Sequence, residues 1–547
     1  MERLQRLFSP RSIAVIGGGA WGAEVLRQCQ KIGFSGDLWA VHPSKPDIAG
    51  LVPFQHVTDL PAPPDAVFIG VNRHLTVDVV RDLSAMGAGG AICFASGFSE
   101  AAAEDADGAG LQVALLDAAQ DMPIIGPNCY GFLNYLDGVA MWPDQHGGLR
   151  AETGVALITQ SSNVAINLTM QARGLPVAYV VTVGNQAQTG FSEVGQALLA
   201  NPKVTALGLH IEGIDDLSAF MELAATAKRL GKPIVALKIG QSEQAQKAAV
   251  SHTASLAGSD AGASALLARL GIGRVTSLSA FLETLKLLHV VGPLASARIA
   301  SMSCSGGEAS LMADAAFGTP VTFPPLTPTQ MQELRATLGP LVALSNPLDY
   351  HTFIWGKEDA LTATFAAMMT PDVALGVVVL DFPRPDRCTS PDWELVLNAV
   401  ARAQDQTGRP IAVLGSLIDN IPEEVSQRLV ARGIMPFCGM SEAFEAIAVA
   451  AFLGNPKHAV TRTYLPPRVI PATILAEGEA KMVLSSYGVT VPLSQRIGAI
   501  SELAQAADMI GFPLVLKGEG VAHKTEAGAV VVGIKDHASL LAAAKAM

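Results

Sequence analysis

IAVIGGG, at residues 13–19, is a short apolar run that passes directly into glycines, and a helical stretch follows it. The same order recurs twice: VALITQSSN at 155–163 and IASMSCSGG at 299–307 both run from apolar residues into small or hydroxyl residues. Each copy starts a series of apolar strands that alternate with helical stretches. This alternation is typical of parallel, doubly wound α/β sheets, so the sequence predicts three of them.

Each series contains five predicted strands. They lie near 12–17, 38–42, 66–72, 90–95 and 123–126 in the first series, near 155–159, 177–183, 206–211, 233–238 and 273–277 in the second, and near 298–303, 320–323, 373–381, 410–415 and 434–437 in the third. A Pro-rich stretch, Leu465-Pro466-Pro467, then reads as a linker. After the linker we predict a helix over 477–487 and a strand over 512–517.

These elements divide the chain into five segments. We predict a Rossmann-like domain at 1–145, a flavodoxin-like domain at 146–293, a second flavodoxin-like domain at 294–456, a linker at 457–470 and a shorter segment at 471–547. A chain of 547 residues is too long for a single core, which agrees with several domains.

Composition excludes several classes of protein. Half of the residues are apolar, only 16% are charged and the formal net charge is −12, with no block of Lys and Arg. A nucleic-acid partner is therefore not expected, because neutralising phosphates takes clustered basic residues. The six cysteines form no C-x-x-C pair, and the sequence contains neither a signal peptide nor an apolar run that spans a bilayer. We expect a cytoplasmic protein that has no membrane partner and forms a homo-oligomer.

The first glycine loop indicates a nucleotide-like ligand. Gly17, Gly19 and Gly22 lie between a strand and a helix, where a helix N-terminus attracts phosphate. An NAD site has Asp or Glu at the end of the next strand, but this strand runs into His42-Pro43-Ser44-Lys45. The lysine suits an additional phosphate, which leaves NADP or coenzyme A as the ligand.

Residues 125–131, Ile-Gly-Pro-Asn-Cys-Tyr-Gly, resemble a segment of succinyl-CoA synthetase α chains and of ADP-forming acetyl-CoA synthetases. The loop at 95–100 resembles a second coenzyme A-contacting loop of that superfamily, the NDP-forming acyl-CoA synthetases. The resemblance implies a coenzyme A site made of the glycine loop, the end of the second strand and these two segments. Its residues are Gly17, Gly18, Gly19, Gly22, Pro43, Lys45, Ser96, Gly97, Phe98, Asn128 and Cys129. Cysteine is commonly buried, and we do not expect Cys129 to be a nucleophile.

Residues 251–258, Ser-His-Thr-Ala-Ser-Leu-Ala-Gly, are the most informative stretch. A histidine in a loop is usually structural, yet imidazole is also a good nucleophile near neutral pH. The stretch resembles the phosphohistidine loop of the same superfamily and occurs in its second domain, as expected there. The resemblance implies that His252 carries the phosphoryl group and that Glu212 orients it.

Two helix starts resemble the pair that cradles the histidine phosphate in the superfamily. The resemblance assigns this role to Ser161, Ser162, Gly306 and Gly307, and helix N-termini do favour anions. The first loop departs from the usual Gln-Ser-Gly, because Ser162 stands where the family has glycine.

The last segment resembles the opening of an ATP-grasp domain. The resemblance implies that Lys517 binds nucleotide phosphates and that His523 is a second relay site. The family holds Mg²⁺ with carboxylates that come later in the module. We therefore expect ATP and Mg²⁺ as cofactors beside coenzyme A, and no metal ligands within these residues. The last segment is too short for a complete nucleotide-binding domain: in a piece of a longer enzyme the ATP chemistry is expected, and in a whole molecule it is doubtful.

The predicted function is acyl-CoA formation from a carboxylic acid, coenzyme A and ATP, with release of ADP and phosphate through a phosphohistidine and an acyl phosphate. The alternative is a coenzyme A-binding regulatory module, or the synthetase-like part of a protein acyltransferase without its own ATP site. An NADP oxidoreductase is a third, less favoured alternative. The loops at 142–146 and 346–351 are candidates for the acyl pocket. Trp142 fits either a cation–π contact or packing, and packing is favoured.

Overall fold

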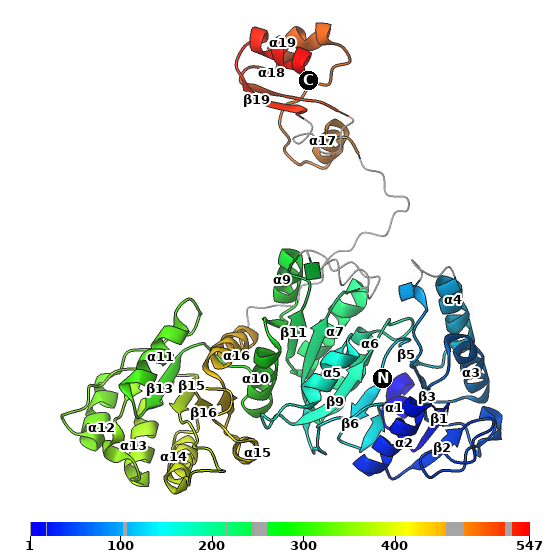
Figure 1. Cartoon of the computed structure of the whole chain (residues 1–547). Coiled ribbons are helices and arrows are strands. Elements are labelled where there is room, and N and C mark those ends of the chain that lie inside the picture. The colour runs from blue at the N-terminus through cyan, green and yellow to red at the C-terminus, as the bar shows by residue number, and fades with distance from the viewer. Residues whose placement is uncertain are drawn as a thin grey trace. The chain divides into compact units, whose positions relative to one another are not determined.

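The computed structural model describes residues 2–17, 19–101, 107–214, 216–242, 244–245, 260–455, 475–519 and 528–547. The chain divides into two compact units, residues 1–463 and 464–547. The first unit contains three sheets of mainly parallel strands with helices packed on them (Figure 1). The predicted α/β class with doubly wound sheets is therefore confirmed.

The first sheet has five parallel strands in the order β2-β1-β3-β4-β5. Every residue of β1, β3, β4 and β5 is buried because helices lie on the sheet, which explains their mainly apolar sequence, whereas the edge strand β2 is partly exposed. The strands are β1 (Ser12–Ile16), β2 (Asp37–Val41), β3 (Ala66–Ile69), β4 (Ala91–Cys93) and β5 (Ile124–Ile125). The helices are α1 (Glu2–Phe8), α2 (Ala20–Ile32), α3 (Arg73–Met86) and α4 (Asp107–Ala119).

The second sheet has seven strands in the order β12-β11-β10-β8-β9-β6-β7. Two of them, β6 (Phe132–Asn134) and β7 (Val139–Met141), were not predicted; they form an antiparallel hairpin that pairs with β9. The predicted strands are confirmed as β8 (Gly154–Thr159), β9 (Val177–Thr182), β10 (Val204–Ile211), β11 (Ile234–Lys238) and β12 (Gly273–Val275). The helices are α5 (Ser162–Thr169), α6 (Phe191–Leu199), α7 (Leu217–Leu230), α9 (Asp260–Arg269) and α10 (Leu278–Val290).

The third sheet has the order β14-β13-β15-β16-β17, and all its pairings are parallel. The strand predicted over 320–323 is wrong: Thr322 makes only an isolated bridge with Arg298, and β14 takes the edge position. Pro324 and Pro325 follow directly and have no N–H to extend a ladder. The strands are β13 (Ile299–Ser303), β14 (Leu348–Asp349), β15 (Leu375–Val379), β16 (Ile411–Gly415) and β17 (Pro436–Cys438). The helices are α11 (Gly306–Ala316), α12 (Pro328–Leu338), α13 (Glu358–Met368), α14 (Pro391–Thr407), α15 (Glu423–Ala431) and α16 (Met440–Leu453).

The second and third sheets share one hydrophobic core, because α10 packs against α16. A buried charge network crosses the same contact. Glu283 accepts from the Arg173 side chain at 3.0 Å and from the Cys438 N–H at 3.1 Å, and the fully buried Lys286 lies 3.2 Å from Glu283. Buried charges of this kind are strongly destabilising when one partner is removed, so the network holds the two parts in one arrangement.

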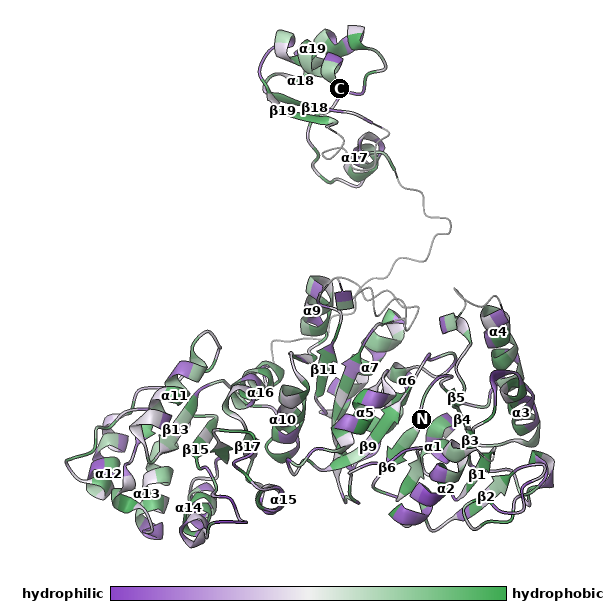
Figure 2. Ribbon diagram, in the orientation of Figure 1, coloured by the Kyte–Doolittle hydropathy of each residue, from purple (hydrophilic) through white to green (hydrophobic). Residues whose placement is uncertain are grey.

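The hydropathy pattern follows these layers. Figure 2 shows hydrophobic strands inside each sheet layer and helices that carry hydrophilic residues. This is the distribution expected where helices bury one face and expose the other.

The second unit is small. It contains α17 (Glu477–Ser486), α18 (Leu503–Ile510), α19 (His537–Ala546) and the antiparallel pair β18 (Leu514–Lys517) and β19 (Val530–Ile534). The predicted helix and strand after the linker are thus both present. The linker itself lies outside the described residues, and no helix in the described part of the chain has the length and apolar content needed to cross a membrane.

Candidate active site

The glycine loop connects β1 to α2, and close packing requires glycine at some of its positions but not at others. A Cβ on Gly17 would come within 2.6 Å of the Gly70 carbonyl oxygen, and one on Gly22 within 2.5 Å of the Gly17 carbonyl oxygen. These two residues are required by close packing. Gly19, the N-cap of α2, would place its Cβ in open space with nothing within 4 Å. Packing therefore does not require a glycine at residue 19, and its small size suits a ligand that binds at the helix N-terminus.

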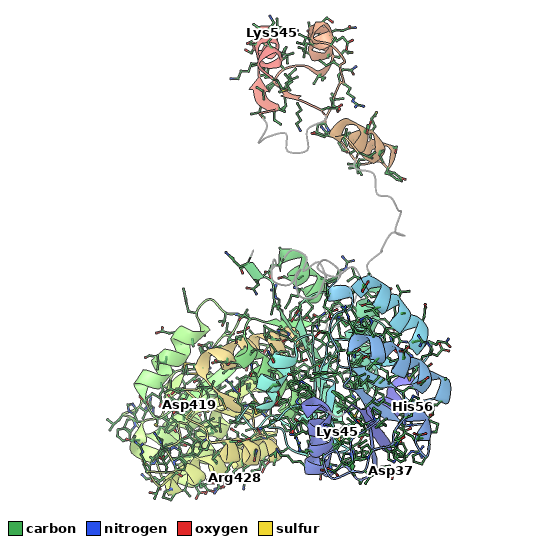
Figure 3. The ribbon with its side chains drawn as sticks, turned by 45° about the vertical axis from the view of Figure 1, so that its right-hand side comes forward. Asp37, Lys45, His56, Asp419, Arg428 and Lys545 are labelled. Atoms are coloured by element: carbon green, nitrogen blue, oxygen red, sulfur yellow. The ribbon has the colours of Figure 1, made fainter. Side chains whose placement is uncertain are left out.

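The segment after β2 is shaped by a histidine. The Nδ1 atom of His42 accepts hydrogen bonds from the backbone N–H groups of Ser44, at 3.2 Å, and Lys45, at 3.0 Å. The turn that contains Pro43 is held in this way. Lys45 lies on the same blue N-terminal part of the chain as His56 and Asp37 (Figure 3).

Two charged side chains fix the loop after β4: Glu100, which belongs to the predicted 95–100 loop, and Arg73, which the sequence did not single out. Arg73 donates to the Gly97 carbonyl at 2.8 Å, while Glu100 accepts from the N–H groups of Gly97, at 2.7 Å, and Phe98, at 3.1 Å. A guanidinium beside this loop adds positive charge where the coenzyme A site is predicted. Arg73 lies outside every predicted motif, and only the fold brings it to the loop.

Two predicted coenzyme A residues point into the core. Phe98 is fully buried, and Cys129 is 2% exposed. Burial raises the pKa of the Cys129 thiol far above its usual range, so this side chain stays protonated and unreactive. Their side chains therefore pack inside the protein. Asn128 has a left-handed φ of 59°.

A series of aromatic rings joins these loops to the second sheet. Trp21 lies 5.6 Å from Phe94 and 6.0 Å from Tyr130, measured between ring centroids, and Tyr130 lies 5.5 Å from Trp142. The Tyr130 N–H also donates to the Ser162 hydroxyl at 3.2 Å, which ties the 125–131 segment to the start of α5. Trp142 itself is fully buried, in agreement with packing rather than ligand contact.

At the carboxyl edge of the second sheet, one glutamine binds two motifs together. The Gln160 side-chain oxygen accepts the N–H groups of Glu212 and Gly213, and its amide donates to the Gly213 carbonyl at 3.1 Å. The start of α5, with Ser161 as its N-cap, is thereby fixed beside Glu212. The Ser161 hydroxyl accepts from the Val164 N–H at 3.4 Å, so it caps the helix.

Two further groups near Glu212 are buried. Lys238, at the end of β11, donates to the Glu212 carbonyl at 2.9 Å, and burial lowers its pKa. His210 lies beside Thr159, and burial, followed by the charge of Lys238, lowers the pKa of His210 to about 4. His210 is therefore a neutral, buried imidazole and not an exposed nucleophile.

The start of α11 differs from a simple anion cradle. Its N-cap, Ser305, makes no side-chain capping bond. A Cβ on Gly306 would lie 3.2 Å from the Asp349 carboxylate, and one on Gly307 would lie 3.5 Å from the Ser305 hydroxyl. Glu308 occupies the first turn, and burial, then Asp381 and Asp349, raise its pKa to about 7. Two carboxyl groups therefore adjoin a helix N-terminus that was predicted to hold phosphate alone.

Three predicted site residues, Gly18, His252 and His523, lie outside the described residues. Lys517 is described; its Nζ atom lies 2.6 Å from the Glu477 carboxylate. Across the described ranges, no group of three or more His, Cys, Asp and Glu side chains is arranged to hold a metal ion.

Three family models match the chain in the order of its parts. A CoA binding domain matches residues 11–135, a succinyl-CoA ligase like flavodoxin domain matches 152–288, and an ATP-grasp domain matches 470–547. A trans-feruloyl-CoA synthase from an unknown prokaryotic organism is 30% identical over 557 residues, which cover 98% of this chain and 77% of that protein. The alpha subunit of an ADP-forming acetate–CoA ligase II from Pyrococcus furiosus is 27% identical, over 82% of this chain and 96% of its own length.

The solved structure of a dinucleotide-forming acetyl-coenzyme A synthetase 1 from Ca. Korarchaeum cryptofilum, in complex with phosphate and ADP, has the same fold. It superposes with a TM-score of 0.71 at 23% identity, over 83% of this chain and 97% of that one. The chain belongs to the ADP-forming acyl-CoA synthetases, which make an acyl-CoA from a carboxylic acid, coenzyme A and ATP and release ADP. The chain is a ligase that uses coenzyme A and ATP, and the resemblance seen in the sequence is confirmed.

Proposed function

We propose that this ligase works through a phosphohistidine at His252, which takes a phosphoryl group from ATP and passes it to the substrate carboxylate. The coenzyme A thiol then displaces phosphate from the acyl phosphate. Glu212 orients the imidazole and favours its charged form after transfer. The protein's work is chiefly positioning and stabilisation of a transferring phosphoryl group.

The arrangement around Gln160 carries this proposal. A carboxylate that can orient a histidine and a helix N-terminus that can bind an anion are fixed at one sheet edge by a single side chain. Ligands of parallel α/β sheets bind at this carboxyl edge. Ser161 and Ser162 on α5, with Gly306 and Gly307 on α11, are the proposed phosphate cradle.

The coenzyme A site is proposed at the carboxyl edge of the first sheet. Gly19 leaves room for phosphate at the start of α2, and Lys45 and Arg73 add positive charge. The segment at 126–131 is placed to receive the pantetheine end, because Tyr130 is bonded to Ser162 at the start of the helix that holds phosphate. Residues 1–145, 146–293, 294–456 and 471–547 are the proposed domains, joined by the linker at 457–470, and the matched family ranges support the order of the parts.

In the second unit, Lys517 is proposed to bind nucleotide phosphates and His523 to serve as the second relay site. The Lys517 ammonium now pairs with Glu477, a partner that a phosphate can replace. Mg²⁺ is proposed to accompany ATP, where it neutralises charge on the phosphates. We also propose a homo-oligomer in the cytoplasm; the six free cysteines agree with a reducing compartment.

Phosphoryl transfer to the protein tests the proposal without ATP. The chain is incubated with acetyl phosphate or benzoyl phosphate labelled with ³²P, and the label on the protein is followed. An acid-labile, base-stable label that maps to His252 and disappears in His252→Ala is expected, with a slower reaction in Glu212→Gln. No label in the unmodified protein, or full labelling of His252→Ala, contradicts the phosphohistidine mechanism. The carboxylic acid is then identified by comparing ferulate, 4-hydroxybutyrate and acetate, the acids in the names of relatives.

A further inference from the structure

Three carboxyl groups meet at the carboxyl edge of the third sheet. Glu308 follows β13 in the first turn of α11, Asp349 ends β14, and Asp381 comes two residues after β15. Because the strand order is β14-β13-β15, these residues surround the point where the chain direction across the sheet reverses. That position is the usual ligand crevice of an open parallel sheet.

Two of the three carboxylates are already committed to partners. Asp381 accepts from the Ser416 N–H at 2.7 Å, the Ser416 hydroxyl at 2.6 Å and the Asn420 amide at 2.9 Å. Asp349 accepts from the His351 N–H at 2.9 Å, and its second oxygen lies 3.7 Å from His351 Nε2. These contacts hold the two charges in place.

Glu308 is different, because its buried Oε2 atom has no hydrogen-bond partner in the described part of the chain. The Tyr350 hydroxyl, on a fully buried residue, is likewise without a partner there. The pKa values of Tyr350 and Cys304 are raised chiefly by burial, and the charge of nearby Glu308 adds to both. A glutamate three residues after an N-cap often bonds back to it, yet Ser305 and Glu308 form no capping box. The carboxyl group is therefore free to act on a ligand.

We propose that Glu308 is the general base of the thiol step, accepting the proton of the coenzyme A thiol as sulfur attacks the acyl phosphate. This inference rests on the proposed function, in which α11 adjoins the reacting phosphate. Burial and the neighbouring carboxylates of Asp381 and Asp349 place the pKa of Glu308 near 7. A general base works best when its pKa lies near the working pH, and a glutamate at its ordinary pKa is a much weaker base.

The step balances without a further reactant. The S–H bond breaks and its proton moves to Glu308, while a new bond forms between sulfur and the acyl carbon. The bond between that carbon and the phosphate oxygen breaks, and phosphate leaves with the electron pair. Glu308 then returns the proton to the departing phosphate or to water.

Thioester formation from acetyl phosphate or benzoyl phosphate with coenzyme A isolates this step, because it needs neither ATP nor histidine phosphorylation. The rate is measured from pH 5.5 to 9 for the unmodified chain, Glu308→Gln, Glu308→Asp and the exposed control Glu333→Gln. The unmodified chain should gain activity as pH rises through about 7. The rate for Glu308→Gln should be lower by about 100-fold or more at pH 7.5 and should not rise through pH 7. Glu308→Asp should keep part of the rate and part of its rise with pH.

Labelling of His252 by acetyl phosphate moves no thiol proton, so it should persist in Glu308→Gln. Thermal unfolding of each variant shows whether the fold is intact. Glu308→Gln with an unchanged rate and pH profile overturns the role of Glu308. An unmodified chain that labels His252 but shows no rise through pH 7 overturns it as well. A chain that neither labels His252 nor makes thioester overturns this inference and the proposed function together.

Discussion

The side-chain amide of Gln160 bridges the backbone of Gly213 in both directions: Nε2 donates to the carbonyl at 3.1 Å, and Oε1 accepts the N–H at 3.1 Å. The bridge joins the start of α5 to the loop that carries Glu212. Its consequence is that the orientation of Glu212 depends on a residue that is itself not expected to touch substrate.

Gln160→Leu removes the bridge and should slow phosphorylation of His252 by acyl phosphate about 10- to 100-fold, because small misplacements of a catalytic group are costly. It should also lower the free energy of unfolding by about 1–3 kcal/mol. Gln171→Leu is the matched control, since Gln171 also bonds two backbone groups, of Leu175 and Arg173, away from Glu212. Equal phosphorylation rates in the two variants would contradict a positioning role.

Gly19→Ala and Gly22→Ala separate ligand binding from packing. The Cβ on residue 22 meets a backbone oxygen at 2.5 Å, so Gly22→Ala should lower the free energy of unfolding by about 1–3 kcal/mol. The Cβ on residue 19 meets nothing, so Gly19→Ala should change stability by less than about 1 kcal/mol. Calorimetric titration with coenzyme A should nevertheless show a Kd at least tenfold higher for Gly19→Ala. Unchanged affinity would place the phosphates elsewhere.

His351 has φ 56° and ψ 171°, a conformation that glycine adopts readily and other residues rarely do. Ala is normally more stable than Gly at an ordinary position, by about 0.5–1 kcal/mol. At residue 351 the order should reverse, with His351→Gly more stable than His351→Ala by about 1–2 kcal/mol. The same pair at His74, in the exposed face of α3, should keep the normal order in urea unfolding. The normal order at both positions would show that residue 351 is unstrained.

Glu308 should make stability depend on pH in a defined direction. Its folded-state pKa of about 7 lies above the usual value of 4.5 for a glutamate, so the folded state holds this proton more tightly than the unfolded state. The unfavourable charged form appears as pH rises from about 4.5 through 7, and stability falls over that window. Glu308→Gln should therefore melt at a higher temperature than the unmodified chain at pH 8, with the difference shrinking towards pH 5. Glu333→Gln should show no such pH-dependent gain.

Most of the fold was open to prediction, because each buried parallel strand is a local apolar run followed by a helix. The β6–β7 hairpin was missed because Phe132–Asn134 is short and pairs with β9, which comes later in the chain. The strand placed over 320–323 failed because Pro324 and Pro325 end the pairing that the apolar residues suggested.

The candidate site also contains residues that local sequence predicts and residues that it does not. The glycine loop, the helix start with Ser161 and Ser162, and Glu212 were indicated by the sequence, because each belongs to a short stretch of adjacent residues that resembles the family. Arg73, Gln160 as a bridge, and Glu308 escaped notice because their roles come from partners far along the chain. Burial raises the pKa of Glu308 most, and the charges of Asp381 and Asp349, which lie at neighbouring strand ends, raise it further.

The buried network of Arg173, Glu283, Lys286 and Cys438 bears on how genes of this kind can be divided. A break between the second and third sheets would uncover Lys286 and separate Glu283 from the Cys438 N–H, and would open a common core. The chain divides into its two compact units between residues 463 and 464 instead. Gene fission and fusion should therefore act at the unit boundary and spare the join near residue 294. The Pyrococcus furiosus alpha subunit, a separate polypeptide, matches 82% of this chain over 96% of its own length.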